Sequence, residues 1–366
     1  CTVLELFMLD WLKKWYANKF SDPQVVTLFL LLLIGFMAIY WLSGILAPVL
    51  VAIAFAYLLE WPVVRLCKLG LSRALSTVTV VAGFVGVATL ILMWIIPIVW
   101  YQGRNLLRDL PQMIEQGKNY LLELPQSFPG MVSVEQINIL MHSVDDRLMG
   151  FGRDMLQLSL TSIVDLVALL IYLVLVPLMV FFMLKDKAQL TGSFVQLLPT
   201  ERKLISQVWH EMNAQIMNYI RGKILEILIV GAVSYAVFAI FGLNYPLLLG
   251  VLVGLSVLIP YVGAAVVTLP VALVAFFQWG PTAEFGYLML AYGVIQALDG
   301  NLLVPLLFSE AVDLNPVFII IAVLFFGGLF GFWGIFFAIP LASLVKATIS
   351  AWSARVHPQA DADAAS

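Results

Sequence analysis

The segment "IQALDGNLLVP", residues 295–305, places polar groups that could do chemistry inside an otherwise apolar part of the chain. Its one ionisable side chain is Asp299, with Gln296 one helical turn before it and Asn301 and Pro305 after it. A carboxylate is costly inside a bilayer, so one found there is a candidate for binding a cation, a proton or a polar solute. The alternative is a buried hydrogen-bonded network of Asp299, Gln296 and Asn301 that only holds helices together.

A second candidate acid, Glu226, lies three residues after Lys223 near the predicted inner boundary of a span. It either lines the same pathway as Asp299 or forms an ordinary ion pair with Lys223. Glu310 and Asp313 belong to the predicted inner loop "FSEAVDLNP". These acids are binding candidates, and no residue is predicted to be catalytic.

The sequence gives no support for an enzyme, a metal centre or an ATP-driven pump. It contains no GxxxxGK[ST] motif, no His, Cys or carboxylate cluster with metal-ligand spacing, and no visible pairing of a nucleophile with a base. The two cysteines, Cys1 and Cys67, exclude a disulfide framework and a cysteine metal site. We therefore expect no cofactor and no bound metal.

The composition is that of a polytopic membrane protein. The chain is 62% hydrophobic and 11% charged, with a mean hydropathy of +1.01, which is far more apolar than a soluble domain tolerates. The bilayer is accordingly the first expected partner. A net charge of -3 gives no reason to expect nucleic acid.

Apolar stretches long enough to cross the bilayer define the elements that must position Asp299. A spanning helix needs about 20 apolar residues. The shorter stretch 45–59 contains Pro48. We predict an all-α transmembrane bundle of about eight spans, five of which are uninterrupted, at about 25–42, 76–101, 163–184, 224–242 and 285–308.

Two long apolar stretches, 246–279 and 316–348, are interrupted in their middle, the first by "IPYVG" and the second by glycines. Paired interrupted segments are the sequence signal of a secondary transporter's binding region, and unwound backbone at membrane depth must be buried in protein or line a wet cavity. The alternative for the glycines is close helix packing of the Gly-x-x-x-Gly kind. Whether each stretch crosses fully or is a re-entrant hairpin stays open. The predicted breaks and hinges are Pro260, Gly263, Pro305, Pro316, Gly327, Gly328, Gly331, Gly334 and Pro340.

The distribution of positive charge predicts that both termini are cytoplasmic. With the N-terminus inside, 14 of the 19 Lys and Arg residues fall on the inner side. The remaining five lie in 102–157, an outer segment too long to weigh heavily in this rule.

Amphipathic patterns predict three elements outside the bilayer. These are a surface helix within 1–24, an external helical hairpin at 102–157, and an inner helical segment at 185–223. The complete predicted order is 1–24, N-terminal transmembrane helices 25–101, hairpin 102–157, transmembrane helix 158–184, inner segment 185–223, C-terminal transmembrane region 224–350 and cytoplasmic tail 351–366.

Several segments resemble one known family. They are "LEWPVVRL" at 59–66, "VLVPLMVFFMLKDK" at 174–187, "LIPYVGAAVVTLP" at 258–270, and "IQALDGNLLVPLLFSEAVDLNP" running into "FFGGLFGFWGIFFAIPLASLVKA". The chain is similar over nearly its whole length to the autoinducer-2 exporter family of bacterial inner-membrane permeases. The similarity is specific in the C-terminal half and looser across 100–157.

The resemblance implies an eight-span bundle with re-entrant or broken elements in the bacterial inner membrane. It also implies a homo-oligomer, with pentamers suggested for relatives, and either export of autoinducer-2 or exchange of sodium for protons, as described for different members. Asn315 stands where many relatives carry a His, which puts in doubt a proton-handling role at that position. The positions that match the family's C-terminal pattern are Asp299, Asn301, Pro305, Pro316, Gly331 and Pro340.

Two functions follow as hypotheses. The first is a secondary transporter or permease for a small solute or cation, in which Asp299 couples or orients the transported species. The second is a non-transporting oligomeric scaffold that recruits partners through its external hairpin. A water-accessible cavity near Asp299 would favour the transporter, and a sealed assembly would favour the scaffold.

Overall fold

The computed structural model describes residues 23–127, 162–196, 203–260, 262–308 and 315–356. Across these residues the chain is almost wholly helical and forms no strand, which confirms the all-α fold class. The helices are α2 (Pro23–Lys68), α3 (Arg73–Ser127), α5 (Ser162–Lys185), α6 (Lys187–Gln196), α7 (Lys203–Ile240), α8 (Pro246–Ser256), α9 (Val262–Trp279), α10 (Ala283–Leu298), the π-helix η1 (Asp299–Leu303), α11 (Val304–Phe308), α12 (Pro316–Phe336) and α13 (Ala338–Val356).

Six segments of the described chain are long and apolar enough to cross a membrane, which confirms a polytopic bundle. Shorter apolar helices occupy Ile171–Lys185, Pro246–Ser256 and Ala338–Thr348. The six candidate spans are Ala47–Lys68, Arg73–Gly117, Val208–Ile240, Val262–Trp279, Ala283–Phe308 and Pro316–Phe336.

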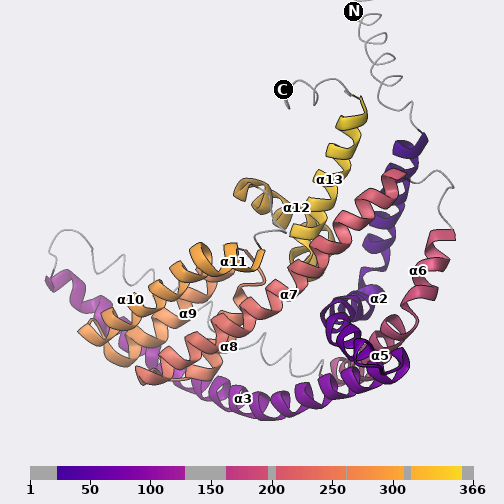
Figure 1. Ribbon diagram of the computed structural model, residues 1–366. Coiled ribbons are helices and arrows are strands. Elements are labelled where there is room, and N and C mark those ends of the chain that lie inside the picture. Colours follow the sequence, from indigo (N-terminus) through magenta and orange to yellow (C-terminus); the bar gives the residue numbers. More distant parts are fainter. Residues whose placement is uncertain (1–22, 128–161, 197–202, 261, 309–314, 357–366) are drawn as a thin grey trace, which may run out of the picture.

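Three helices are longer than the hydropathy pattern suggests. α2 runs through both 25–42 and 45–59 with Pro48 inside it, and its axis changes direction along its length (Figure 1). α3 joins the span 76–101 to the first part of the predicted external hairpin. α7 joins the predicted inner segment to the span 224–242, because no proline interrupts its 38 residues.

The long helix α7 crosses the middle of the molecule (Figure 1). One apolar cluster packs α7 against α8, α9 and α10, and another packs it against α2, α11, α12 and α13. A further cluster joins α2, α3 and α5. In Figure 1, α3 follows the base of the molecule from the α9–α10 side to α5. The arrangement makes α7 the element that both interrupted stretches share.

Polar contacts fix the middle of α3 to the start of α8. The Leu248 amide donates to Gln102 Oε1 at 2.8 Å, which satisfies one of the N–H groups left open at the first turn of α8. The Tyr245 hydroxyl donates to Asp109 Oδ2 at 2.5 Å. Burial, and then the Asp109 carboxylate, raise the pKa of Tyr245 to about 12. These two contacts therefore hold the middle of α3 against the start of the first interrupted stretch.

Some predicted elements lie outside the described residues. They are most of the surface helix within 1–24, the second half of the external hairpin from 128 to 157, the end of the tail from 357 to 366, and the inner-loop acids Glu310 and Asp313.

Candidate functional site

A buried ion pair on α7 lies at the centre of the candidate site. Lys223 Nζ and Glu226 Oε2 are 2.7 Å apart, and the two side chains are only 4% and 3% exposed. Two charges are held in an apolar interior only when their attraction and hydrogen bonds offset the loss of hydration. The sequence left open whether Glu226 has this partner, and the structure shows that it does.

Lys223 also contacts the first interrupted stretch. Its Nζ donates to the Val257 carbonyl at 2.8 Å, directly after the end of α8. The last carbonyls of any helix lack partners within the helix, so the lysine satisfies one of the groups that the interruption exposes. The Phe308 ring lies 5.3 Å from the same ammonium. The ammonium thus contacts a carboxylate, a backbone carbonyl and an aromatic ring.

Asp299 lies beside this pair, at the point where the spanning helix changes type. It directly follows α10 and begins the π-helix Asp299–Leu303, a wider turn that is rare and frequent at functional sites. Asp299 Oδ1 is buried and has no hydrogen-bond partner in the described structure. Its carboxylate interacts electrostatically with both Lys223 and Glu226. The site therefore holds two carboxylates and one ammonium.

One turn before Lys223, Tyr219 makes the matching contact with the second interrupted stretch. Its hydroxyl donates to the Phe336 carbonyl at 2.8 Å, where α12 ends. The Phe308 ring lies 5.7 Å from the Tyr219 ring, between the two contacts. Successive turns of α7 therefore hold the carbonyls of both interruptions.

In each interrupted stretch, the two helical segments approach each other closely at a glycine that packs against a backbone carbonyl. A Cβ on Gly263 would lie 1.7 Å from Ser256 O, and one on Gly334 would lie 1.8 Å from Phe326 O. No side chain fits at either position. Within α12 the helical geometry is lost at Gly331, with φ 61° and ψ -138°, and the helix ends at Phe336.

The polar neighbours of Asp299 in sequence do not form a network with it. Gln296 Nε2 donates to the Tyr292 hydroxyl at 2.8 Å, and that hydroxyl lies 3.2 Å from Thr268 Oγ1 on α9. Asn301 donates instead to the Ala297 carbonyl at 2.8 Å. These bonds join α9 to α10 and brace the π-helix, but they leave Asp299 without a side-chain donor.

The remaining predicted positions are spread along the interrupted region. Asn315 caps α12 by accepting from the Val317 amide at 3.0 Å, with Pro316 as the first helical residue. A Cβ on Gly327 would meet Ile335, whereas one on Gly328 would meet open space. Pro305 is exposed in α11, and Pro340 is buried near the start of α13.

Lys223 and Tyr219 were not predicted as site residues. Lys223 was treated only as a boundary charge, because the inner segment was expected to end at 223. The available signal was the spacing of Tyr219, Lys223 and Glu226, which places all three on one face of a continuous helix.

The described residues contain no group of three or more His, Cys, Asp or Glu side chains that could hold a metal ion. The site instead brings the carboxylate oxygens of Glu226 and Asp299 together with the ammonium of Lys223 among apolar side chains.

Comparison with known sequences identifies the family. A sequence model described as "AI-2E family transporter" matches residues 29–354. The chain belongs to this family. This AI-2E family member is 52% identical over 345 residues to "Putative permease PerM" of Escherichia coli K12, covering 94% of this chain and 98% of that protein.

More distant relatives give the same general assignment. "Putative transport protein YueF" of Bacillus subtilis is 28% identical and covers 84% of each chain. "AI-2 transport protein TqsA" of Escherichia coli K12 is 24% identical, over 88% of this AI-2E family member and 90% of that protein. Together with the apolar helices, these matches assign the chain to a family of multi-pass membrane transport proteins.

Proposed function

We propose that this AI-2E family member is a secondary transporter whose pathway passes Asp299 and Glu226. The observation that carries the proposal is the buried Lys223–Glu226 pair beside Asp299, at the point where two interrupted stretches and a π-helix meet. Ionisable side chains at such positions in membrane proteins mark substrate and ion paths.

The state of Asp299 favours transport over a purely structural role. A structural network is stable when every buried polar atom has a partner, and a partly satisfied one is a liability. Glu226 has its ammonium, but Asp299 Oδ1 has no hydrogen-bond donor in the described structure. A transported cation, proton or polar solute would supply the missing contact.

The interruptions are suited to rearrangement. Their carbonyls are held by single side-chain donors from α7, Lys223 and Tyr219, and not by a continuing helix. α8 has 11 residues and is therefore about 17 Å long, against a hydrocarbon core of about 30 Å. This length supports a re-entrant hairpin at 246–279.

Several finer assignments belong to the same proposal. The transported species is a small solute or a cation, moved by export or by exchange for protons. The similarity to the AI-2 transport protein TqsA supports autoinducer-2 as one solute to test. The protein lies in a bacterial inner membrane with both termini cytoplasmic and with an external helical hairpin at 102–157. It is a homo-oligomer, with a pentamer as one arrangement.

The test is flux in proteoliposomes that contain purified protein, with a pH dye inside and sodium or potassium pulses outside. Wild type should move protons in response to a cation, and Asp299→Asn should abolish that response while the protein still folds and assembles. Glu284→Gln is the matched control, because it also replaces a carboxylate by an amide, at an exposed position in the first turn of α10. Normal flux in Asp299→Asn would refute the coupling role.

If wild type gives no ion response, uptake of autoinducer-2 and other small solutes is measured in the same vesicles. Solute movement that Asp299→Asn removes would support a permease without ion exchange. The absence of any movement would overturn the transporter and favour the scaffold.

A further inference from the structure

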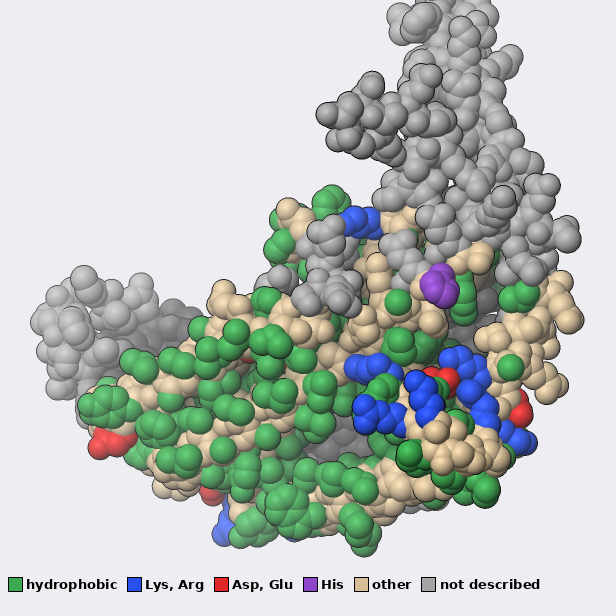
Figure 2. Space-filling view, in the orientation of Figure 1, with side chains coloured by type: hydrophobic (Ala, Val, Ile, Leu, Met, Phe, Trp, Pro, Cys, Tyr) green, Lys and Arg blue, Asp and Glu red, His purple; other side chains and the backbone are tan. Residues whose placement is uncertain are grey.

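A second charged region lies at the corner where α2, α3, α5 and α6 meet, away from the buried pair. Lys and Arg side chains gather on this part of the surface, whereas the face over α8, α9 and α10 is mainly hydrophobic (Figure 2). We call it the basic corner. Its members are the basic residues Arg65, Lys68, Arg73, Lys185 and Lys187 and the acidic residues Glu60 and Asp186.

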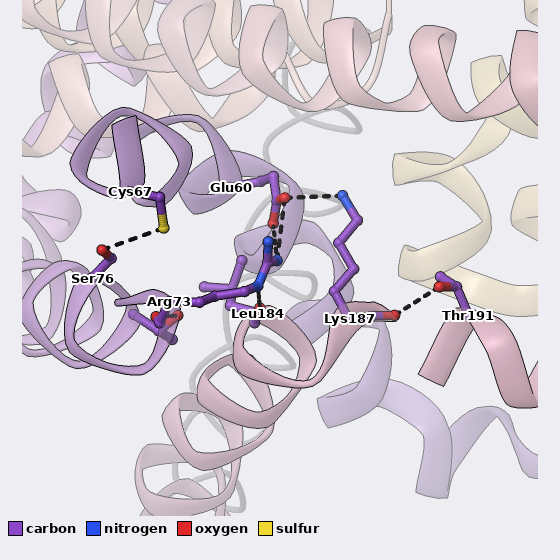
Figure 3. A network of polar contacts seen from close by, with 8 residues as sticks. Glu60, Cys67, Arg73, Ser76, Leu184, Lys187 and Thr191 are labelled. Atoms are coloured by element: carbon purple, nitrogen blue, oxygen red, sulfur yellow. Dashed lines mark hydrogen bonds and ion pairs between the residues drawn. The ribbon is translucent and has the colours of Figure 1, made fainter. Parts of the chain in front are cut away.

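Part of the basic corner is a closed structural network (Figure 3). Glu60 Oε1 lies 3.0 Å from Lys187 Nζ and 3.4 Å from Arg73 Nη2. Arg73 Nε also donates to the Leu184 carbonyl at 2.8 Å. Glu60 is therefore neutralised by two cations, and the ends of α2, α3 and α5 are held in one geometry.

The network leaves two cations without an acidic partner. Neither Arg65 nor Lys68, both exposed, has a carboxylate partner among the residues that the structure describes. The Arg65 guanidinium lies 4.3 Å from the centre of the Trp61 ring, an attractive contact that holds its planar fork of N–H donors in place.

The backbone that carries these cations is a defined turn. The Leu71 amide donates to the Leu66 carbonyl at 3.3 Å, and the Gly70 amide donates to the Cys67 carbonyl at 3.1 Å. With Gly70 at φ 98°, this is the usual hydrogen-bonded termination of a helix. Arg65 and Lys68, in the last turn of α2, therefore have fixed backbone positions.

The turn also lies at a membrane boundary, because it connects the candidate spans Ala47–Lys68 and Arg73–Gly117. Apolar side chains are exposed beside the cations, with Leu69 77% exposed and Trp61 52% exposed. Tryptophan with neighbouring Lys and Arg is typical of the headgroup level of a bilayer. The cations and the exposed apolar side chains therefore lie at the same level, that of the lipid headgroups.

We infer that the basic corner is a binding site for an anionic phospholipid, whose phosphate is held by Arg65 and Lys68 while its acyl chains lie along Leu69 and Trp61. A planar guanidinium and an ammonium match a phosphate, and basic pockets between transmembrane helices are known to hold anionic headgroups. The adjoining apolar side chains favour a lipid over a free anion. The inference is independent of whether the protein transports a solute.

The test is native mass spectrometry of the purified full-length protein in detergent, titrated with dioleoyl phosphatidylglycerol or dioleoyl phosphatidylcholine. Wild type should bind phosphatidylglycerol more tightly than phosphatidylcholine. Since each basic group near an anionic surface is worth roughly fivefold in affinity, Arg65→Gln with Lys68→Gln should weaken phosphatidylglycerol binding by about 5- to 25-fold. The control pair Arg104→Gln with Arg108→Gln removes two exposed cations from α3 elsewhere and should leave the preference unchanged.

Three results would overturn the inference. Equal affinity for the two lipids in wild type would remove the headgroup preference. Equal loss in the control pair would show a nonspecific charge effect. Displacement of phosphatidylglycerol by inorganic phosphate at the same concentration would assign the site to a free anion. A phosphatidylglycerol titration of Trp61→Ala adds a further check, because without the ring the Arg65 fork is no longer held and binding should fall by a few fold.

Discussion

The two interrupted stretches, 246–279 and 316–348, are constructed alike and differ in one respect. In each, a glycine packs closely on a backbone carbonyl, and a carbonyl at the end of a helix accepts a hydrogen bond from a side chain of α7. The donor to the second stretch is the neutral hydroxyl of Tyr219, whereas the donor to the first is the charged ammonium of Lys223. The ammonium of Lys223 also pairs with Glu226 and interacts electrostatically with Asp299, so charged side chains gather beside the first stretch.

The largest effect is expected where the two stretches are alike. Gly263→Ala and Gly334→Ala would each place a Cβ less than 2 Å from a backbone oxygen. The backbone must move, so the cost should exceed the roughly 1–3 kcal/mol typical of overpacking. Size-exclusion chromatography in detergent should show loss of folded protein for both variants.

Gly328→Ala is the control for that experiment, since a Cβ there meets nothing within 4 Å. It should elute as wild type. Wild-type behaviour of Gly263→Ala would contradict the close crossing of α8 and α9.

The next largest loss of stability should differ between the two stretches. Lys223→Met removes one partner of a buried ion pair and leaves Glu226 uncompensated, which costs about 3–5 kcal/mol. Tyr219→Phe only leaves the Phe336 carbonyl without its donor, at about 1–3 kcal/mol. Unfolding in detergent, monitored by circular dichroism, should therefore give Lys223→Met a clearly lower unfolding free energy than Tyr219→Phe. A lower stability of Tyr219→Phe would contradict the greater importance of the charged donor, Lys223, over the neutral donor, Tyr219.

A double-mutant cycle sharpens the same point. Lys223→Met with Glu226→Leu removes both charges together, so the double variant should recover stability relative to either single variant. Additive losses of unfolding free energy would mean that the two side chains do not act as a pair.

The smallest effect concerns the start of the second stretch. Asn315→Ala removes the side-chain acceptor of the Val317 amide and should cost about 0.5–2 kcal/mol with flux unchanged. Asn315→Asp keeps the acceptor and should behave as wild type in thermal unfolding. A loss of flux in Asn315→Ala at unchanged stability would place function, and not only capping, at this position.

The sequence predicted the kind of fold because hydropathy reports burial in lipid directly. It singled out Asp299 as a candidate because a lone acid within "IQALDGNLLVP" stands out from its apolar context. It located both interrupted stretches by Pro260 and the glycines. It did not predict the length of α3 or α7, because helical hydrogen bonding continues across the boundary between lipid and water.

The contacts within the site were harder to predict from the sequence. Gln296 and Asn301 were grouped with Asp299 by spacing along one helix, yet Gln296 hydrogen-bonds within α10 and Asn301 to the backbone. Lys223 reaches Val257, 34 residues away, which depends on how α8 packs against α7. Such tertiary contacts follow from packing, which periodicity does not encode.

The most direct test of the central claim is whether water reaches position 299 from outside the bilayer. Asp299→Cys, with Cys1→Ser and Cys67→Ser, is treated with a membrane-impermeant thiol reagent in right-side-out and in inverted vesicles. Leu290→Cys, an exposed position of the same candidate span Ala283–Phe308, is the control that should stay unmodified. A pathway past Asp299 predicts modification of Asp299→Cys from at least one side. Absence of modification from both sides, as for Leu290→Cys, would contradict the transporter and leave the buried charges as parts of a sealed scaffold.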